Sequence, residues 1–159
     1  MKSNGQFTQR AELAIENART AAGSLGHSYV GTEHLLLGIA MESEGLGARI
    51  LEKHGIGEKE LRLAITDLFG TGTQSIPGQG LTARARIAME KAAAEADHLR
   101  QGYIGTEHII LGVIRQSDSG GVRVLTNTGV DINDIYTDIM DAFGAPNSRS
   151  KPQAGAVRS

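Results

Sequence analysis

The feature that most constrains the fold of this chain is an internal repeat at an offset of 74 residues. The segment 29–34 recurs as 103–108 with a single conservative difference. Residues 7–70 align with residues 81–144 without a gap, and 24 of the 64 aligned pairs are identical. A register kept over this length is typical of two copies of one structural unit. The sequence therefore predicts two equivalent repeats that form one domain.

The remaining segments are short. Residues 71–80 are rich in glycine and predict a linker between the repeats. Residues 1–6 form an N-terminal lead. Residues 145–159 contain two prolines, small polar residues and basic residues, so we expect a disordered tail or tether.

Each repeat has the hydrophobic spacing of four helices. In the first repeat the expected helices cover roughly 8–24, a segment that begins at Thr32, 44–54 and 58–69. Alternating strand patterns are missing. The predicted fold class is all-α, with about eight helices arranged as two tandem four-helix repeats related by pseudo-twofold symmetry.

Local residue choices support these boundaries. Thr8 and Asp131 are good N-cap residues, and Gly55 is placed as a left-handed residue after a helix. The first helix carries a stripe of mostly small residues, which favours close approach of another helix: Ala11, Ile15, Ala18 and Ala22.

Composition excludes several function classes. A net charge of −2 argues against a general affinity for nucleic acid or anionic membrane. The absence of cysteine excludes disulfides and thiolate sites. No apolar run resembles a signal peptide or approaches the roughly 20 residues of a membrane span, so a cytoplasmic protein is expected. We expect no cofactor.

No motif indicates an enzyme. The Walker A pattern and the nucleophile-elbow pattern are both missing from the sequence. His34 and His108 each follow a glutamate, which raises a metal hypothesis. Adjacent helical residues point about 100° apart, and the pattern His-Glu-x-x-His is absent, so satisfied and partly buried histidines are favoured. A small all-α metal-dependent hydrolase that uses Glu33, His34, Glu107 and His108 remains the alternative from another class.

Two motifs carry a resemblance to a known family. Phe-Thr-x-Arg-Ala opens the first helix at Phe7, and Gly-Thr-Glu-His opens the second helix at Gly31 and again at Gly105. Over residues 7–144 the chain resembles the Clp N-terminal repeat, closest to the N-terminal domain of ClpC-type unfoldases.

The resemblance implies a function in protein quality control. Domains of this type stand at the front of a hexameric ATP-driven unfoldase that feeds a compartmental protease. They receive substrate proteins, dock adaptor proteins and, in ClpC members, bind phosphorylated arginine. The chain would then be a binding module, with ATPase activity in modules beyond residue 159. A free-standing decoy or adaptor without a motor is the alternative.

Four residues are the candidate phosphoarginine ligands. Glu33 and Glu107 lie in the first turn of a helix, where a carboxylate also answers the positive helix end. Each would accept the ligand's guanidinium group. Thr8 and Thr82 cap helix starts whose free N–H groups suit a phosphoryl group. The resemblance to ClpC implies that Thr8 pairs with Glu33 and Thr82 with Glu107, one site in each repeat.

The second repeat departs further from the family pattern. The first repeat has Gly26-His27 before its second helix, whereas the second repeat has Arg100-Gln101. On the expectation that each repeat contains its own site, the site of the second repeat should be the weaker one.

Overall fold

A computed structural model describes residues 6–73 and 76–144. The expectation of a disordered tail at 145–159 lies outside these described residues. Within them the fold is helical, and the prediction of eight helices in two four-helix repeats is confirmed. The helices of the first repeat are α1 (Gln9–Ser24), α2 (Thr32–Glu42), α3 (Leu46–Lys53) and α4 (Glu58–Phe69). Those of the second repeat are α5 (Ala83–His98), α6 (Thr106–Ile114), α7 (Gly120–Asn127) and α8 (Ile132–Ala142).

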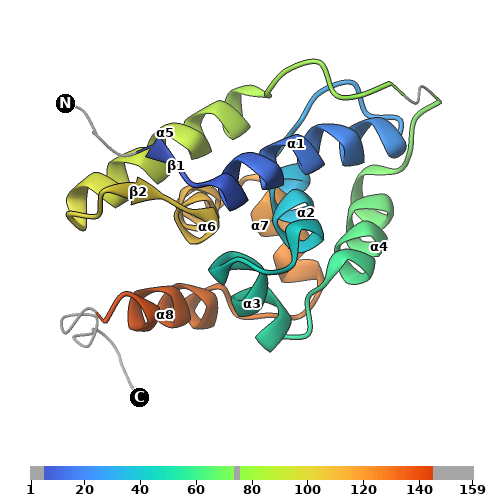
Figure 1. Cartoon of the computed structure of the whole chain (residues 1–159). Coiled ribbons are helices and arrows are strands. Elements are labelled where there is room, and N and C mark those ends of the chain that lie inside the picture. The colour runs from blue at the N-terminus through green and yellow to red at the C-terminus, as the bar shows by residue number, and fades with distance from the viewer. Residues whose placement is uncertain (1–5, 74–75, 145–159) are drawn as a thin grey trace.

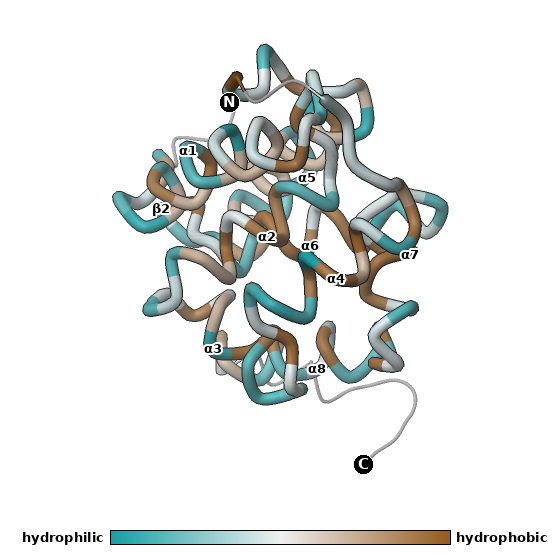
Figure 2. Tube along the Cα trace, turned by 90° about the vertical axis from the view of Figure 1, so that its right-hand side faces the viewer, coloured by the Kyte–Doolittle hydropathy of each residue, from teal (hydrophilic) through white to brown (hydrophobic). Residues whose placement is uncertain are grey.

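The helices form layers around α2 and α6. In Figure 1, α1 and α5 lie on one side of this central pair, whereas α3 and α8 lie on the other. Figure 2 shows hydrophobic stretches on α2 and α6 in the middle of the molecule, as well as on the surrounding helices. The largest fully buried side chains of α2 and α6 are Leu35, Leu36, Leu37, Ile39, Ile109, Ile110 and Leu111.

The small residues of the first helix have the expected effect. Ala14 and Ala18 of α1 are buried, and α2 approaches them at Gly38. A Cβ atom at Gly38 would lie 2.1 Å from the backbone oxygen of Ala14, so only glycine permits this approach. In the second repeat, a Cβ atom at Gly112 of α6 would lie 2.0 Å from the backbone oxygen of Ala88 of α5. Both repeats therefore use the same close helix pair.

The predicted caps are also present. The hydroxyl oxygen of Thr8 accepts a hydrogen bond from the Ala11 N–H at 3.0 Å, and that of Thr82 accepts one from Ala85 at 3.1 Å. Asp131 caps α8 through the Asn133 N–H, and Gly55 has a left-handed φ of 78°. Each repeat therefore begins its first helix with a threonine cap.

The structure adds short strands that the sequence analysis did not expect. Strand β1 (Gln6–Phe7) pairs in parallel with β2 (Tyr103–Ile104). The related bridge joins Val30 to Leu81. Runs of two residues are too short to show an alternating pattern. These pairings matter because each joins the start of one repeat's first helix to the segment before the other repeat's second helix.

None of the helices in the described part of the chain combines the length and apolarity that crossing a membrane requires.

Candidate functional site

The candidate residues are brought together across the repeats. The Thr8 N–H donates to the Ile104 carbonyl at 3.0 Å, two residues before α6 begins. In the related contact, the Thr82 N–H donates to the Val30 carbonyl at 2.9 Å. Thr8 therefore lies beside the start of α6, which carries Glu107, and not beside the start of α2.

The expected pairing within each repeat is therefore wrong. The structure forms a Thr8–Glu107 site and a Thr82–Glu33 site, each with one threonine and one glutamate from different repeats. The physical reason is that the short parallel pairings cross between the repeats. Two further hydrogen bonds hold the crossing: Gly47 N–H to the Thr106 hydroxyl at 2.9 Å, and Gly121 N–H to the Thr32 hydroxyl at 2.7 Å.

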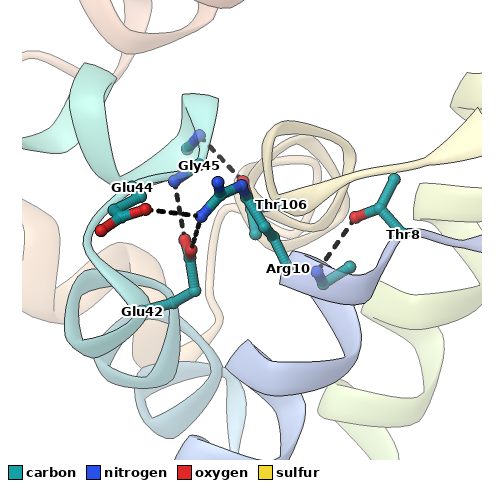
Figure 3. A network of polar contacts seen from close by, with 8 residues as sticks. Thr8, Arg10, Glu42, Glu44, Gly45 and Thr106 are labelled. Atoms are coloured by element: carbon teal, nitrogen blue, oxygen red, sulfur yellow. Dashed lines mark hydrogen bonds and ion pairs between the residues drawn. The ribbon is translucent and has the colours of Figure 1, made fainter.

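The Thr8–Glu107 site is an open hollow of about 520 Å³. The starts of α1, α3 and α6 form its walls, as Figure 3 shows in part. Its lining residues are Thr8, Gln9, Arg10, Glu44, Gly45, Leu46, Arg49, Tyr103, Gly105, Thr106 and Glu107.

The start of α1 supplies hydrogen-bond donors to this hollow. The Thr8 hydroxyl takes up the Ala11 N–H, whereas the backbone N–H groups of Gln9 and Arg10 have no acceptor among the described residues. Free N–H groups at a helix start, together with the helix dipole, favour an anion. This wall is therefore suited to a phosphoryl group.

Glu107 gives the opposite wall an acidic character. The residue is 5% exposed, and burial raises the pKa of its carboxyl above the usual value. Hydrogen bonding to its own backbone and from the Tyr103 and Thr106 hydroxyls opposes this rise. Glu107 makes no ion pair with any described residue. A nearly buried carboxylate without a cation is suited to receive one from a ligand.

Arg10 forms ion pairs with two glutamates at the rim of the hollow. Its guanidinium contacts Glu42 at 2.8 Å and Glu44 at 3.2 Å, as drawn in Figure 3. Glu42 also accepts the Gly45 N–H at 2.8 Å, which holds the turn between α2 and α3. These carboxylates raise the pKa of Arg10 further. Arg10 is thus occupied by protein groups.

The Thr82–Glu33 site has the same backbone plan and different side chains around it. Gly120 replaces Leu46 at the start of the facing helix, and a Cβ atom there would lie 2.6 Å from Oε1 of Glu33 and 3.3 Å from Phe69. Arg123, the counterpart of Arg49, lies over the Phe69 ring at 5.2 Å. Burial raises the pKa of Glu33, while hydrogen bonding to its own backbone and the positive charge of Arg123 oppose the rise. The Phe69 ring therefore lies next to both Gly120 and Arg123 at this site.

The two histidines beside the glutamates are satisfied, as expected. Nδ1 of His34 accepts the Gly31 N–H, and Nδ1 of His108 accepts the Gly105 N–H, both at 2.9 Å. The proton of each ring then lies on Nε2. The Nε2–H of His34 donates to Nδ1 of His27 at 2.8 Å, and that of His108 donates to Oε1 of Gln101 at 2.5 Å.

These contacts bear on the metal hypothesis. Burial lowers the pKa of both histidines to about 4, so both rings are neutral near pH 7. The 3.7 Å approach of His34 to Glu33 is consequently not an ion pair, because Nδ1 is already an acceptor. Both ring nitrogens have protein partners, and no group of three candidate ligands gathers among the described residues. The geometry does not support the alternative hydrolase.

Several site residues were not singled out from the sequence. Only the packing of the helices shows that three residues lie at the sites: Arg49, Tyr103 and Phe69. All three are identical between the two repeats, and this identity was visible in the sequence. Identity between repeats marks a shared environment but does not tell a core contact from a ligand contact.

Solved structures place this duplicated helical architecture among the N-terminal domains of Clp ATPases. The N-terminal domain of the chaperone ClpD from Arabidopsis thaliana superposes with a TM-score of 0.73 at 25% identity, covering 86% of this chain and 96% of that one. The N-terminal domain of Hsp104 from Candida albicans shares the fold, with a TM-score of 0.68 at 16% identity over 88% of this chain and 93% of that one.

The chain belongs to the Clp N-terminal repeat family. The Clp repeat N-terminal domain matches twice, over residues 6–80 and 80–158. Relatives include the negative regulator of genetic competence ClpC/MecB of Bacillus subtilis, 36% identical over 92% of this chain, and the chaperone ClpB of Oceanobacillus iheyensis, 36% identical over 94%. The chain spans 18% of the length of each of these relatives.

Proposed function

We propose that this chain is the substrate- and adaptor-recognition domain of an ATP-dependent Clp unfoldase and protease system. Membership in the Clp repeat family and the relatedness to ClpC support the assignment. Unfolding and proteolysis would be carried out by other modules and subunits, to which this domain delivers proteins. Its own task would be binding.

The ligand class that fits the two candidate sites is phosphoarginine on a protein. The side chain carries planar N–H donors at its guanidinium and negative charge at its phosphoryl group, so a receptor needs an acidic acceptor beside an anion site. The observation that carries the proposal is Glu107, a carboxylate that is 5% exposed and has no cationic partner in the described chain, in one hollow with the α1 start. Glu33 and Thr82 supply the same two residue types, a first-turn glutamate and a capping threonine, on the other side.

Calorimetric titration of phosphoarginine tests the proposal. The variant Glu33→Ala with Glu107→Ala should lose measurable binding, because a charge-assisted hydrogen bond contributes roughly 1.5–3 kcal/mol, or about 10- to 100-fold in affinity at each site. Glu12→Ala is the matched control, since Glu12 is an exposed first-turn glutamate outside both sites. It should bind like the wild type.

Two results would contradict the proposal. One is equal affinity in the wild type and the double variant. The other is no binding of phosphoarginine by the wild type at millimolar concentration. Circular dichroism of the double variant must match that of the wild type, because loss of helix would explain loss of binding without any role for the carboxylates.

A further inference from the structure

Arg49 and Arg123 occupy equivalent positions in the two repeats, on α3 and α7, and both are exposed. Their surroundings differ. Arg49 lines the hollow that holds Thr8 and Glu107, and it makes no ion pair within the described residues. Its guanidinium is therefore available to an anion that enters the hollow.

The other arginines near the two sites are already engaged. Arg10 is held by Glu42 and Glu44, at 2.8 and 3.2 Å. Its counterpart Arg84 contacts Asp118 at 2.5 Å and the Gln116 side chain at 3.4 Å. Among the described residues, Arg49 is thus the arginine lining the Thr8–Glu107 site that has no carboxylate partner.

Arg123 is held by an aromatic ring. Its guanidinium lies 5.2 Å from the centre of the Phe69 ring, which is a cation–π arrangement. The counterpart of Phe69 is Phe143, and that ring stacks on His108 at 5.1 Å and not on an arginine. The two equivalent phenylalanines therefore have different partners: Phe69 contacts Arg123, whereas Phe143 contacts the buried His108.

Two substitutions between the repeats account for this difference. His27 packs edge-on against His34 and contacts the Gly70 carbonyl at 2.9 Å, so the space over His34 is filled. At the equivalent position Gln101 contacts Nε2 of His108, and Phe143 stacks on the face of that ring. On the other side, Gly120 leaves room that Leu46 fills at the Thr8–Glu107 site, and Phe69 lies against it.

We propose that Arg49 binds the phosphoryl group at the Thr8–Glu107 site, and that Phe69 withholds Arg123 from the Thr82–Glu33 site. This inference rests on the proposed function. It deepens that function by ranking the two sites: the wild-type chain binds one phosphoarginine well and a second one poorly. The threonine-capped helix start and the glutamate are common to both sites, whereas the free arginine is not.

Titration calorimetry with phosphoarginine measures the ranking directly. The wild type should show one strong equivalent. Arg49→Gln should weaken it by about 10- to 100-fold, as expected for loss of a charged phosphoryl contact. Phe69→Ala should add a second equivalent, because Arg123 is released. Phe143→Ala is the matched control and should leave one equivalent, provided its circular dichroism matches the wild type.

The outcomes separate the ranking from the proposed function. Two equal equivalents in the wild type, unchanged affinity in Arg49→Gln, or a single equivalent in Phe69→Ala would each overturn the inference while phosphoarginine binding stands. No wild-type binding at millimolar ligand would end the proposed function itself. A ligand-free readout tests the withholding step: the Arg123 side-chain resonances should move in Phe69→Ala and those of Arg49 should not. Unmoved Arg123 resonances would overturn it.

Discussion

The Thr8–Glu107 and Thr82–Glu33 sites share a backbone and differ in what surrounds it. Both have a capped helix start from one repeat, a first-turn glutamate from the other and a histidine fixed by a backbone N–H, and of the two glutamates only Glu107 is fully buried. The Thr8–Glu107 site opens into a hollow lined by Arg49, whose guanidinium makes no ion pair with the described residues. At the Thr82–Glu33 site, Phe69 and Arg123 lie against each other. The two repeats thus share the hydrogen-bonded frame and differ at single packing positions around it.

The largest expected effect tests whether the two histidines are equivalent. His34 and His108 should each titrate near pH 4 by NMR, although their ring partners differ. Their pKa is lowered from 6.5 in the folded state, so the unfolded state takes up protons first as the pH falls. Stability is full above about pH 6.5 and is lost towards pH 4, at about 1.4 kcal/mol per unit and so about 3 kcal/mol for each histidine.

The glutamates provide the control for this acid effect. The pKa of Glu33 and that of Glu107 are raised in the folded state, so these groups favour folding as they take up protons, which is the opposite direction. Thermal unfolding of Glu33→Gln with Glu107→Gln should therefore show a steeper loss between pH 6.5 and 4. A histidine midpoint near 6.5 in either repeat would break the equivalence.

The next effect concerns the close helix pairs. Gly38→Ala and Gly112→Ala should each destabilise the fold at the upper end of about 1–3 kcal/mol, since the new methyl group would meet a backbone oxygen at 2.1 or 2.0 Å. Chemical denaturation measures both. Gly80→Ala, where a Cβ atom meets nothing within 4 Å, is the control. A large difference between Gly38→Ala and Gly112→Ala would contradict the equivalent packing of the two helix pairs.

Single glutamate variants sharpen the contrast between the sites. Glu107→Ala should weaken the strong equivalent of phosphoarginine by about 10- to 100-fold. Glu33→Ala should leave that equivalent nearly unchanged, because Glu33 serves the covered site. Calorimetry under identical buffer conditions decides between them, and a greater loss in Glu33→Ala than in Glu107→Ala would reverse the ranking.

The smallest effect tests the caps. Thr8→Ala and Thr82→Ala should each cost about 1 kcal/mol of unfolding free energy, because each removes the acceptor for one N–H in the first helical turn. Thr8→Ser and Thr82→Ser retain the hydroxyl and should recover most of the loss. Stability unchanged in both alanine variants would contradict the capping geometry.

Much of the fold followed from the sequence because its determinants are local. The N-cap threonines, Asp131 and the left-handed Gly55 act within a few residues of their own position. Because the two repeats align without a gap, the helices predicted for one repeat could be predicted at the equivalent positions of the other. The prediction of four helices in each repeat needed no knowledge of long-range contacts.

The site could not be assembled in the same way. A perfect repeat gives Thr8 the same local surroundings whether it meets Glu33 or Glu107, so sequence spacing does not distinguish the two pairings. The choice is made by two-residue pairings such as Phe7 with Ile104, which leave no periodic pattern. The position of Phe69 could not be predicted from the sequence for a related reason. It depends on how His27 packs on His34, a contact between residues of different elements.

The crossing of the repeats also bears on how such a domain could arise. One repeat on its own carries a threonine cap and a glutamate but cannot bring them together, because each needs the other half. Two separate copies docked about a true twofold axis would form two identical sites, and any mutation would alter both at once. Joining the copies in one chain removes that coupling: a histidine at position 27 no longer requires a histidine at position 101. In one covalent chain, the residues around one site can therefore change while those around the other site stay the same.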